Sequence, residues 1–417
     1  MDTENKNILA VNGGSSSIKF SLYGTDEPSV SNDGTTTDGT AGRHAGELLT
    51  KWLSGKIDRI GQGGTELTYT DSRNKQQGHL TVPAADLPGA AAFLLDWLGK
   101  QPGAATIAAT GHRIVHGLQH TQAGVIDDAL LKDLERISAY DPDHLPGEIE
   151  LIRLMRRHDP GMLQVACFDT AFHSAMPRVA KLLPIPRRYS HAGVQRYGFH
   201  GLSYAYIVEE LNRIAGADAA GGSVIIAHLG NGASVAAVRD GVSVDTTMGF
   251  TPAGGIMMGT RPGDLDPGVV WYLLSTEKWD PGQFDHFVNH ECGLLGVSET
   301  TSDMQDLLAR ESSDVRAAEA VGLFCYQVKK TIGAYSAVLG GLDTLVFTGG
   351  IGEKSAVIRS RVCAGLAYLG IDLDQRANAD NALSLSAAGA RVSVYAIPTD
   401  EEWMIARTVN DLLFTKR

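Results

Sequence analysis

Four short segments of the sequence place a charged or imidazole side chain among glycine, proline or aromatic residues. The segments, each with the residue that could act chemically, are 111–117 (GHRIVHG) with Arg113, 168–173 (FDTAFH) with Asp169, 196–201 (RYGFHG) with His200, and 258–267 (MGTRPGDLDP) with Arg261. Taken singly, such residues are more often structural, because a loop Arg usually forms an ion pair and a His beside Gly is usually hydrogen-bonded in a core. Together they supply what phosphoryl transfer requires: Arg and His donors that spread negative charge, and a carboxylate.

Three glycine-rich segments could bind phosphate through backbone N–H groups. They are 12–17 (NGGSSS), 230–234 (GNGAS) and 348–353 (TGGIGE). Such segments can direct several N–H groups at an anion, because no side chain stands in the way, although a plain tight turn is at least as common for any one of them. The sequence has no GxxxxGK[ST] motif and no GxGxxG after a strand, so a P-loop or Rossmann nucleotide site is not expected.

The first two glycine-rich segments lie in similar surroundings. Residues 7–24 are predicted to form a strand, a tight turn and a second strand, and residues 222–241 repeat this plan. The repeat predicts a duplicated domain, although two unrelated hairpins would give the same pattern. Further strands are expected at 163–168, 345–348 and 392–397, and helices at 127–138, 147–157, 204–214, 314–339 and 402–414. Strands that alternate with helices indicate an α/β fold. Two phosphate-binding hairpins, with a third glycine turn before a helix, describe the actin, Hsp70 and sugar-kinase architecture.

The composition excludes several classes of function. With 417 residues the chain has room for two or three domains, and its net charge of −12 argues against nucleic acid as a partner. The four cysteines form no CxxC pair, so neither a zinc site nor a disulfide framework is indicated. The polar N-terminal sequence MDTENKN and the lack of a long apolar segment predict a cytoplasmic protein without a membrane partner.

In their order along the chain, these segments resemble those of the acetate kinase family. The resemblance runs from about residue 7 to the C-terminus and rests on segments 11–19, 111–117, 168–173, 196–201, 228–232, 245–252, 258–267, 347–353 and 397–402. It implies duplicated ribonuclease H-like domains with an active-site cleft between them. The first domain would comprise residues 1–168, with the helix at 400–417 packing back on it, and residues 169–399 would form the nucleotide-binding domain.

The resemblance also implies the reaction and its cofactors. The family transfers the γ-phosphoryl group of ATP reversibly to acetate or another short-chain carboxylate, giving acyl phosphate and ADP, with Mg²⁺ as the metal and Mn²⁺ as an alternative. A homodimer is implied as well. A carboxylate acceptor is already ionised at neutral pH and needs no general base, so direct in-line transfer without a covalent enzyme intermediate is expected.

The same resemblance assigns roles to individual residues. Asn12 and Glu401 would organise Mg²⁺, partly through water. Arg113 and Arg261 would flank the reacting carboxylate and phosphoryl group, because an Arg fork matches both kinds of oxyanion. His200 would donate to the equatorial oxygens in the transition state, and Asp169 would position groups at the reacting centre. Val115, Phe199 and Pro252 would line an apolar acyl pocket, and the nucleotide would be bound by Ser15, Ser17, Lys19, His228, Leu229, Gly230, Asn231, Gly232, Asp303, Met304, Gln305, Gly350, Ile351, Gly352, Glu353 and Lys354.

The sequence departs from the usual family pattern near both expected substrate sites. The segment 139–146 (AYDPDHLP) stands where a Pro-Leu-His-Asn-Pro-Pro-like string is usual, with Pro142 as a substitute for one wall of the acyl pocket. On the nucleoside side, Gln305 replaces a common Arg and Lys354 a common Asn. Residues 253–255 also lack an acidic residue that often follows the Thr-Pro pair.

Three alternative functions therefore stay open: a propionate or butyrate kinase, a pyrophosphate-dependent relative, and a non-catalytic nucleotide-sensing protein of the same fold. The intact 350–352 glycine segment favours ATP over pyrophosphate. Retention of Arg113, His200 and Arg261 favours catalysis, because nucleotide sensing needs no carboxylate clamp.

Overall fold

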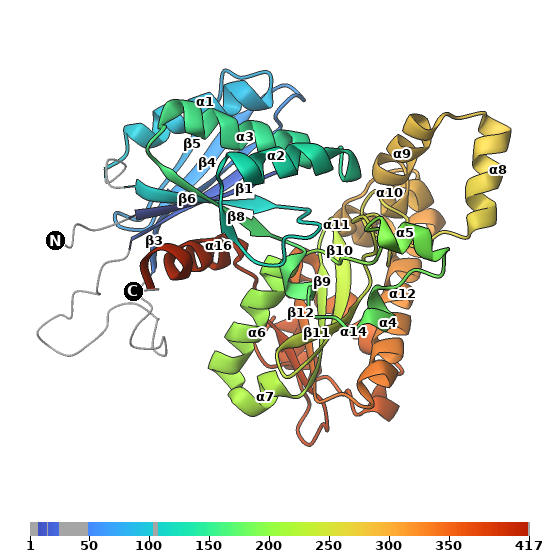
Figure 1. Cartoon of the computed structure of the whole chain (residues 1–417). Coiled ribbons are helices and arrows are strands. Elements are labelled where there is room, and N and C mark those ends of the chain that lie inside the picture. Colours follow the sequence, from blue (N-terminus) through green and yellow to red (C-terminus); the bar gives the residue numbers. More distant parts are fainter. Residues whose placement is uncertain (1–6, 15, 25–48, 103–106, 416–417) are drawn as a thin grey trace, which may run out of the picture. The chain divides into compact units, whose positions relative to one another are not determined.

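The computed structural model describes residues 7–14, 16–24, 49–102 and 107–415 (Figure 1). The chain forms two compact units. Unit 1 contains the described residues up to Ala171 and those from Asp400 onward, and unit 2 contains Phe172–Thr399. Each unit is built around one β-sheet.

The sheet of unit 1 combines an antiparallel meander with parallel strands. Its strands, in spatial order, are β5 (Gln76–Thr81), β4 (Glu66–Asp71), β3 (Thr50–Asp58), β2 (Ile18–Gly24), β1 (Asn7–Gly13), β6 (Ile107–Ile114), β8 (Leu163–Phe168) and β7 (Gly124–Val125). Strands β1, β2 and β3 are antiparallel, whereas β6 runs parallel to both β1 and β8. Every residue of β1 is buried, because helices cover both faces of the sheet at this position.

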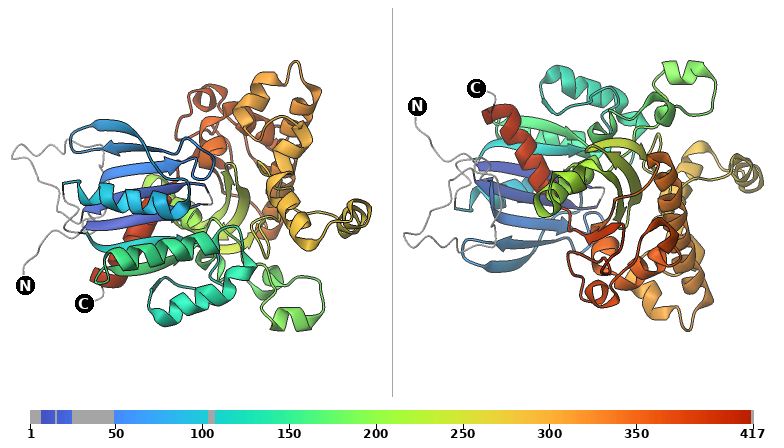
Figure 2. Two further views of the ribbon diagram at one scale, coloured as in Figure 1. Left: turned by 90° about the horizontal axis from the view of Figure 1, so that it is seen from above. Right: turned by 90° about the horizontal axis from the view of Figure 1, so that it is seen from below.

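Helices lie on both faces of this sheet, as Figures 1 and 2 show. One face carries α1 (Leu87–Gly99), α2 (Asp128–Ile137) and α3 (Leu145–His158), and apolar side chains of α1 and α3 pack on β1 and β2. The opposite face carries α16 (Glu401–Asn410), which contacts β1 and β6 and continues into a π-helical turn, Asp411–Thr415. Asp400 caps α16 by accepting a 2.9 Å hydrogen bond from the Trp403 amide. This fixes the start of the helix on which Glu401 lies.

The sheet of unit 2 repeats the strand plan of unit 1. Its order is β11 (Val242–Thr246), β10 (Ala233–Arg239), β9 (Ser223–Leu229), β12 (Thr344–Thr348) and β13 (Ser393–Ala396). Strands β9, β10 and β11 are antiparallel, and β12 runs parallel to β9 and β13. The order β3-β2-β1-β6-β8 in unit 1 has the same directions. The duplication predicted from the two hairpins is therefore confirmed.

Helices cover both faces of the second sheet. On one face α6 (Gly201–Ala215) and α7 (Ala217–Gly221) pack against β9 and β10 through a buried apolar cluster, and on the other face α12 (Val315–Leu339) contacts the same strands. The remaining helices of unit 2 are α4 (Arg178–Lys181), α5 (Arg187–His191), α8 (Pro267–Glu277), α9 (Pro281–His290), α10 (Gly293–Ser298), α11 (Met304–Arg310), α13 (Gly349–Lys354), α14 (Ala356–Cys363) and α15 (Gln375–Ala379). None of the helices that the structure describes is long and apolar enough to cross a membrane.

One predicted element was wrong. The segment 348–353 was expected to form a glycine turn before a helix, but Gly349–Lys354 is itself the helix α13, which follows β12 directly. Gly349 makes this abrupt change possible, because its φ is +74° and a Cβ there would lie 2.7 Å from the Leu229 carbonyl oxygen.

Candidate active site

Three polar side chains of unit 1 lie at the carboxyl ends of neighbouring parallel strands. Asn12 is near the end of β1, Arg113 is near the end of β6, and Asp169 directly follows β8. The order β1-β6-β8 brings these strand ends to one edge of the sheet. Glu401, the first residue of α16, joins them from the helix that crosses β1 and β6. Residues far apart in sequence thus form one polar cluster.

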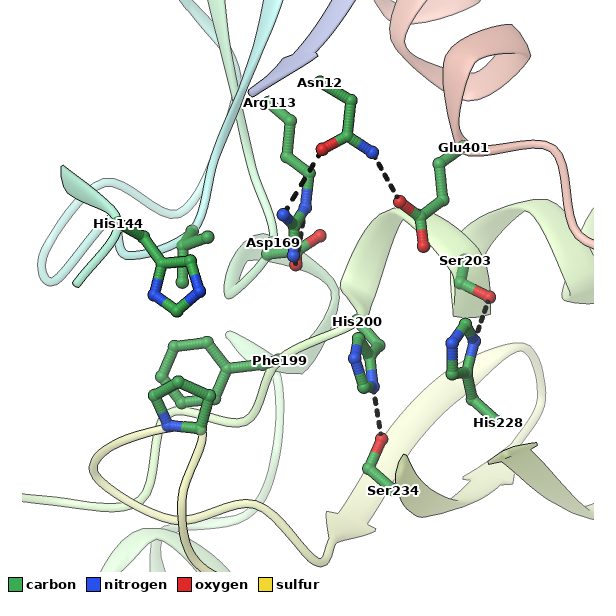
Figure 3. Close-up of polar contacts among 12 residues, drawn as sticks. Asn12, Arg113, His144, Asp169, Phe199, His200, Ser203, His228, Ser234 and Glu401 are labelled. Atoms are coloured by element: carbon green, nitrogen blue, oxygen red, sulfur yellow. Dashed lines mark hydrogen bonds and ion pairs between the residues drawn. The ribbon is translucent and has the colours of Figure 1, made fainter. Parts of the chain in front are cut away.

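Hydrogen bonds fix the geometry of this cluster (Figure 3). Arg113 donates from Nε and Nη2 to Oδ2 of Asp169, at 3.0 and 2.5 Å, and from Nη1 to Oδ1 of Asn12 at 3.3 Å. Asn12 in turn donates from Nδ2 to Oε2 of Glu401 at 3.0 Å. Asp169 is fully buried. Two nitrogens of Arg113 donate to the same buried oxygen of Asp169, so the pair is held in a single orientation. Removing either partner would leave an uncompensated buried charge.

The charges of the cluster shift one another's titration. Burial would lower the pKa of Arg113, but the negative charges of Asp169 and Glu401 raise it, so the guanidinium stays protonated. Burial raises the pKa of Glu401 to about 7; Arg113 opposes this rise and Asp169 adds to it. A cation beside Glu401 would relieve the repulsion between the carboxylates of Glu401 and Asp169. The carboxylate of Glu401 and the amide oxygen of Asn12 are hard ligands of the kind that Mg²⁺ prefers, so these residues fit such an ion.

The histidines on either side of Arg113 are structural. His112 is buried within β6, where Nε2 contacts Oε1 of Gln164 at 2.8 Å, and burial lowers its pKa to about 4. His116 is fully buried, and its Nδ1 accepts a hydrogen bond from the Leu118 amide at 3.1 Å. In the segment 111–117, Arg113 is therefore the residue available for chemistry.

In unit 2, the loop before α6 presents His200 in a fixed position. His200 has a φ of +59°, in the left-handed region, directly before the helix begins at Gly201. Gly198 has a φ of +77°, and a Cβ there would lie 2.5 Å from the Thr246 side chain and 2.6 Å from that of His173. Only glycine fits this position, so the loop is closely packed rather than adaptable.

Two other side chains hold the same loop. Nη1 of Arg196 donates to the carbonyl oxygens of residues 246, 247 and 248, at 2.9, 2.9 and 3.2 Å. The buried His173 ring contacts the Phe199 carbonyl oxygen at 3.0 Å and the Ser243 hydroxyl at 2.8 Å. Arg196 and His173, although part of the sequence signatures, therefore serve to position the loop.

His200 is stacked on a second histidine, His228, near the end of β9. Their ring centroids lie 4.2 Å apart with an interplanar angle of 23°. Nδ1 of His200 contacts the Ser234 hydroxyl at 2.9 Å, and Nδ1 of His228 contacts the Ser203 hydroxyl at 2.8 Å (Figure 3). Each ring is thus held by a serine hydroxyl at its Nδ1 atom.

The glycine turn between β9 and β10 lies directly beside these donors. A Cβ built on Gly232 would be 3.0 Å from Nη2 of Arg261 and 3.3 Å from Nε2 of His200. Arg261 is braced by a 2.9 Å hydrogen bond from Nη1 to the Pro252 carbonyl oxygen. Arg261 and His200 therefore converge on a backbone turn that carries no side chain at this point, which is an arrangement suited to a phosphate group.

The segment expected to border the nucleoside is held by a residue that the sequence did not indicate. Arg359 in α14 is fully buried and donates from Nη1 to the carbonyl oxygens of Gly352 and Glu353, both at 2.8 Å. It also donates to both oxygens of Asn378. Glu353 accepts a 3.1 Å hydrogen bond from the Thr399 amide, so its carboxylate is used to tie α13 to the end of the unit.

The other predicted nucleotide residues are placed as follows. Ser17 closes the first hairpin turn, where its carbonyl oxygen accepts from the Gly14 amide at 2.7 Å, and Lys19 is exposed on β2 opposite Asn12. Ser15 lies outside the described residues. Asp303 caps α11, the helix that contains Met304 and Gln305, by accepting from the Gln305 and Asp306 amides.

The predicted acyl-pocket residues Val115 and Phe199 are both almost completely buried. In unit 1, the Val115 amide donates to the buried carboxyl of Glu148, a residue that sequence reasoning missed, at 3.1 and 3.3 Å. In the unusual segment 139–146, Pro142 is exposed, whereas Asp141 is buried and contacts the His144 ring at 2.8 Å. This segment therefore places the Asp141 carboxylate in the interior of unit 1, paired with a partly exposed His144 ring.

The duplicated fold is the one found in phosphotransferases of the actin, Hsp70 and sugar-kinase type, and each unit carries a cluster of groups that phosphoryl transfer can use. Residues 7–407 match the Acetokinase family, and the chain belongs to this family. It is 41% identical over 410 residues to the acetate kinase of Methylocella silvestris, covering 97% of this chain and 98% of the relative. It is 40% identical over 408 residues to the propionate kinase of Citrobacter rodentium, covering 96% of each.

Solved structures agree with this assignment. A propionate kinase from Francisella tularensis has a TM-score of 0.85 at 32% identity, covering 97% of this chain and 98% of its own. An acetate kinase from Porphyromonas gingivalis has a TM-score of 0.83 at 32% identity, covering 98% and 100%. The resemblance to acetate kinase and the duplicated ribonuclease H-like fold inferred from the sequence are both confirmed.

Proposed function

We propose that this member of the Acetokinase family transfers the γ-phosphoryl group of ATP reversibly to a short-chain carboxylate, giving acyl phosphate and ADP. The observation that carries the proposal is the guanidinium of Arg113, fixed by Asp169 and Asn12 at the strand ends of unit 1. A fixed Arg fork matches the two oxygens of a carboxylate, and a carboxylate acceptor needs no general base. Asp169 therefore orients Arg113 and takes no proton from the substrate.

The cluster of His200, His228 and Arg261 in unit 2 acts on the phosphoryl group. His200 and Arg261 converge on the turn at Gly232, where they would donate to oxygens that gain negative charge in the transition state. His228 stacks on His200 and supplies a second imidazole. The Gly350–Lys354 segment, held by Arg359, would border the nucleoside. Because these groups are fixed before the substrates bind, little reorganisation is needed during the reaction.

Asn12 and Glu401 would hold Mg²⁺, with Mn²⁺ as an alternative, and water and phosphate oxygens would complete the shell. When bound, the ion supplies positive charge that neutralises the phosphates. Asn12 also links Arg113 to Glu401 through its two amide atoms, so the carboxylate-binding and metal-binding groups are oriented together.

Acetate is the first candidate acceptor and propionate the second, because relatives that carry either name match this chain at nearly equal identity. The test is a panel of acids from formate to valerate, with ATP or pyrophosphate as donor and acyl phosphate trapped by hydroxylamine. We expect turnover with ATP and both short acids. One extra methylene changes binding by only about 1–3 kcal/mol, so discrimination between them should be modest. If no acid yields acyl phosphate, the proposed function is wrong.

The assembly is proposed to be a cytoplasmic homodimer without nucleic-acid or membrane partners. Helix α8 contributes no buried residue, and its Trp271 and Tyr272 side chains are 70% and 59% exposed. Large aromatic side chains exposed together on one helix mark a surface that another protein covers, and a second copy of the chain is the simplest partner. Light scattering coupled to gel filtration gives the mass that tests this.

A further inference from the structure

The two stacked histidines of unit 2 are each attached to a short series of hydroxyl groups. The Ser203 hydroxyl contacts Nδ1 of His228 at 2.8 Å and accepts a hydrogen bond from the Thr399 hydroxyl at 2.9 Å. The Ser234 hydroxyl contacts Nδ1 of His200 at 2.9 Å and the Tyr204 hydroxyl at 2.5 Å. Each histidine thus has a serine on Nδ1, and each serine has a second hydroxyl behind it.

The opposite nitrogen of each ring faces the glycine turn. Nε2 of His200 lies 3.3 Å from the position of a Cβ on Gly232, and Nε2 of His228 lies 3.9 Å from that of a Cβ on Gly230. Both serines are fully buried. The hydroxyl series therefore approach the rings from the protein interior, and the Nε2 atoms are the ones that can meet a phosphate on the turn.

The hydroxyl groups behind each ring favour one tautomer. A hydroxyl group has one hydrogen to donate. Thr399 donates to Ser203, so the Ser203 hydrogen is available to Nδ1 of His228, and a bond in that direction places the imidazole proton on Nε2. The Tyr204 phenol is a more acidic donor than an aliphatic hydroxyl, which favours a bond from Tyr204 to Ser234 and from Ser234 to Nδ1 of His200. The stacking of the rings at 4.2 Å also disfavours two charged imidazoles, because they would repel each other.

We propose that Ser203 and Ser234 are positioning residues that fix His228 and His200 in the tautomer with the proton on Nε2, so that both rings present an N–H donor to the phosphate. The inference rests on the proposed function for the identity of the anion, but the tautomer itself does not depend on it. A ring with its proton on Nδ1 would instead turn a lone pair toward the phosphate oxygens. Loss of either serine would therefore remove a transition-state donor or let it rotate, while leaving the nucleotide contacts elsewhere in unit 2 in place.

The direct test is the ¹⁵N spectrum of the histidine rings in the full-length protein. Two-bond ¹H–¹⁵N correlations distinguish protonated from unprotonated ring nitrogens, and His200→Gln and His228→Gln variants assign the signals. We expect Nδ1 unprotonated and Nε2 protonated in both rings at pH 7.5. A proton on Nδ1 of either ring would overturn the proposal for that ring, whether or not the protein proves to be a carboxylate kinase.

The second test is kinetic. Ser203→Ala and Ser234→Ala should each lower kcat about tenfold or more, with a smaller change in the KM for ATP, because a donor used in the transition state is affected. Ser203→Thr and Ser234→Thr keep the hydroxyl group and should therefore recover most of the lost rate. If the alanine variants were slow only because of altered packing, restoring the hydroxyl would not be expected to restore the rate. Wild-type kcat in the alanine variants, or threonine variants as slow as the alanine ones, would refute the positioning role. Calorimetric ADP binding confirms that each variant is folded.

Discussion

Replacing Glu148 by glutamine should change how the stability of the protein depends on pH. Glu148 is buried in α3, and burial raises the pKa of its carboxyl from 4.5 to about 8, although Arg113 and the bond from the Val115 amide oppose the rise. A pKa that is raised in the folded state means that folding favours the protonated form. The stability that the Glu148 carboxyl contributes to the folded protein is fully present below about pH 4.5 and is lost as the pH rises through 8.

The size of the effect follows from this shift. Each pH unit well between the two pKa values changes the free energy of unfolding by roughly 1.4 kcal/mol, and the slope falls off as the folded carboxyl ionises near pH 8, so the wild type should lose about 2 kcal/mol from this group between pH 6 and pH 8. Glutamine at position 148 still accepts from the Val115 amide and does not ionise. The variant should therefore become more stable relative to the wild type by about this amount across the same interval.

The assay is chemical denaturation of both proteins at pH 6, 7 and 8, followed by the fluorescence of the buried tryptophans Trp52 and Trp97 of unit 1. Glu150→Gln is the matched control, because Glu150 lies on the same helix but pairs with Arg157 at the surface. This control should parallel the wild type, since a surface pair contributes little. If Glu148→Gln also parallels the wild type from pH 6 to pH 8, the argument about the buried carboxyl is wrong.

Three further substitutions test other parts of the structure. Arg261→Ala should lower kcat about a hundredfold or more with little change in ADP affinity, because the group acts in the transition state; near-normal turnover would remove Arg261 from it. Arg359→Met leaves the carbonyl oxygens that bind its guanidinium without a donor. It should lower the free energy of unfolding by about 3 kcal/mol and raise the KM for ATP, and an unchanged KM would show that α13 does not border the nucleotide. Trp271→Glu should shift the mass measured by light scattering from dimer to monomer, and an unchanged dimer mass would place α8 outside the interface.

Local sequence signals predicted most of the elements on which the clusters are built, but not β6, which carries Arg113. The strand-turn-strand pattern at 7–24 and 222–241 was correct because the hairpins are formed by residues close in sequence. Strands β3 to β7 and β11 were not predicted. The edge strand β5, QQGHLT, is almost entirely exposed and carries no apolar run, so it is defined by its pairing with β4 rather than by its own residues.

The residues that orient the site could not be predicted from the sequence. Ser203 lies in α6, in a stretch that no motif marks, and Ser234 and Thr399 lie in marked segments whose local sequence does not show that they orient a histidine. Arg359 similarly lies in an ordinary helix, where an Arg is usually solvated. Their roles depend on contacts between distant segments, which only the folded chain reveals.

Unit 1 is built from chain segments that lie before and after unit 2, and this order affects how the protein folds during synthesis. Its central strand, β1, is the first described segment of the chain, whereas α16, which contacts β1 and β6, is made only after all of unit 2. Unit 2 is continuous from Phe172 to Thr399 and can fold while the ribosome is still at work, because domains generally fold as units during translation. Unit 1 must wait with the α16 face of its sheet uncovered until the segment from Asp400 onward emerges. Since Glu401 arrives with that helix, a chain that stops before residue 400 would lack both the cover of the sheet and a member of the Arg113 cluster, so the polypeptide should acquire activity only after α16 has been made.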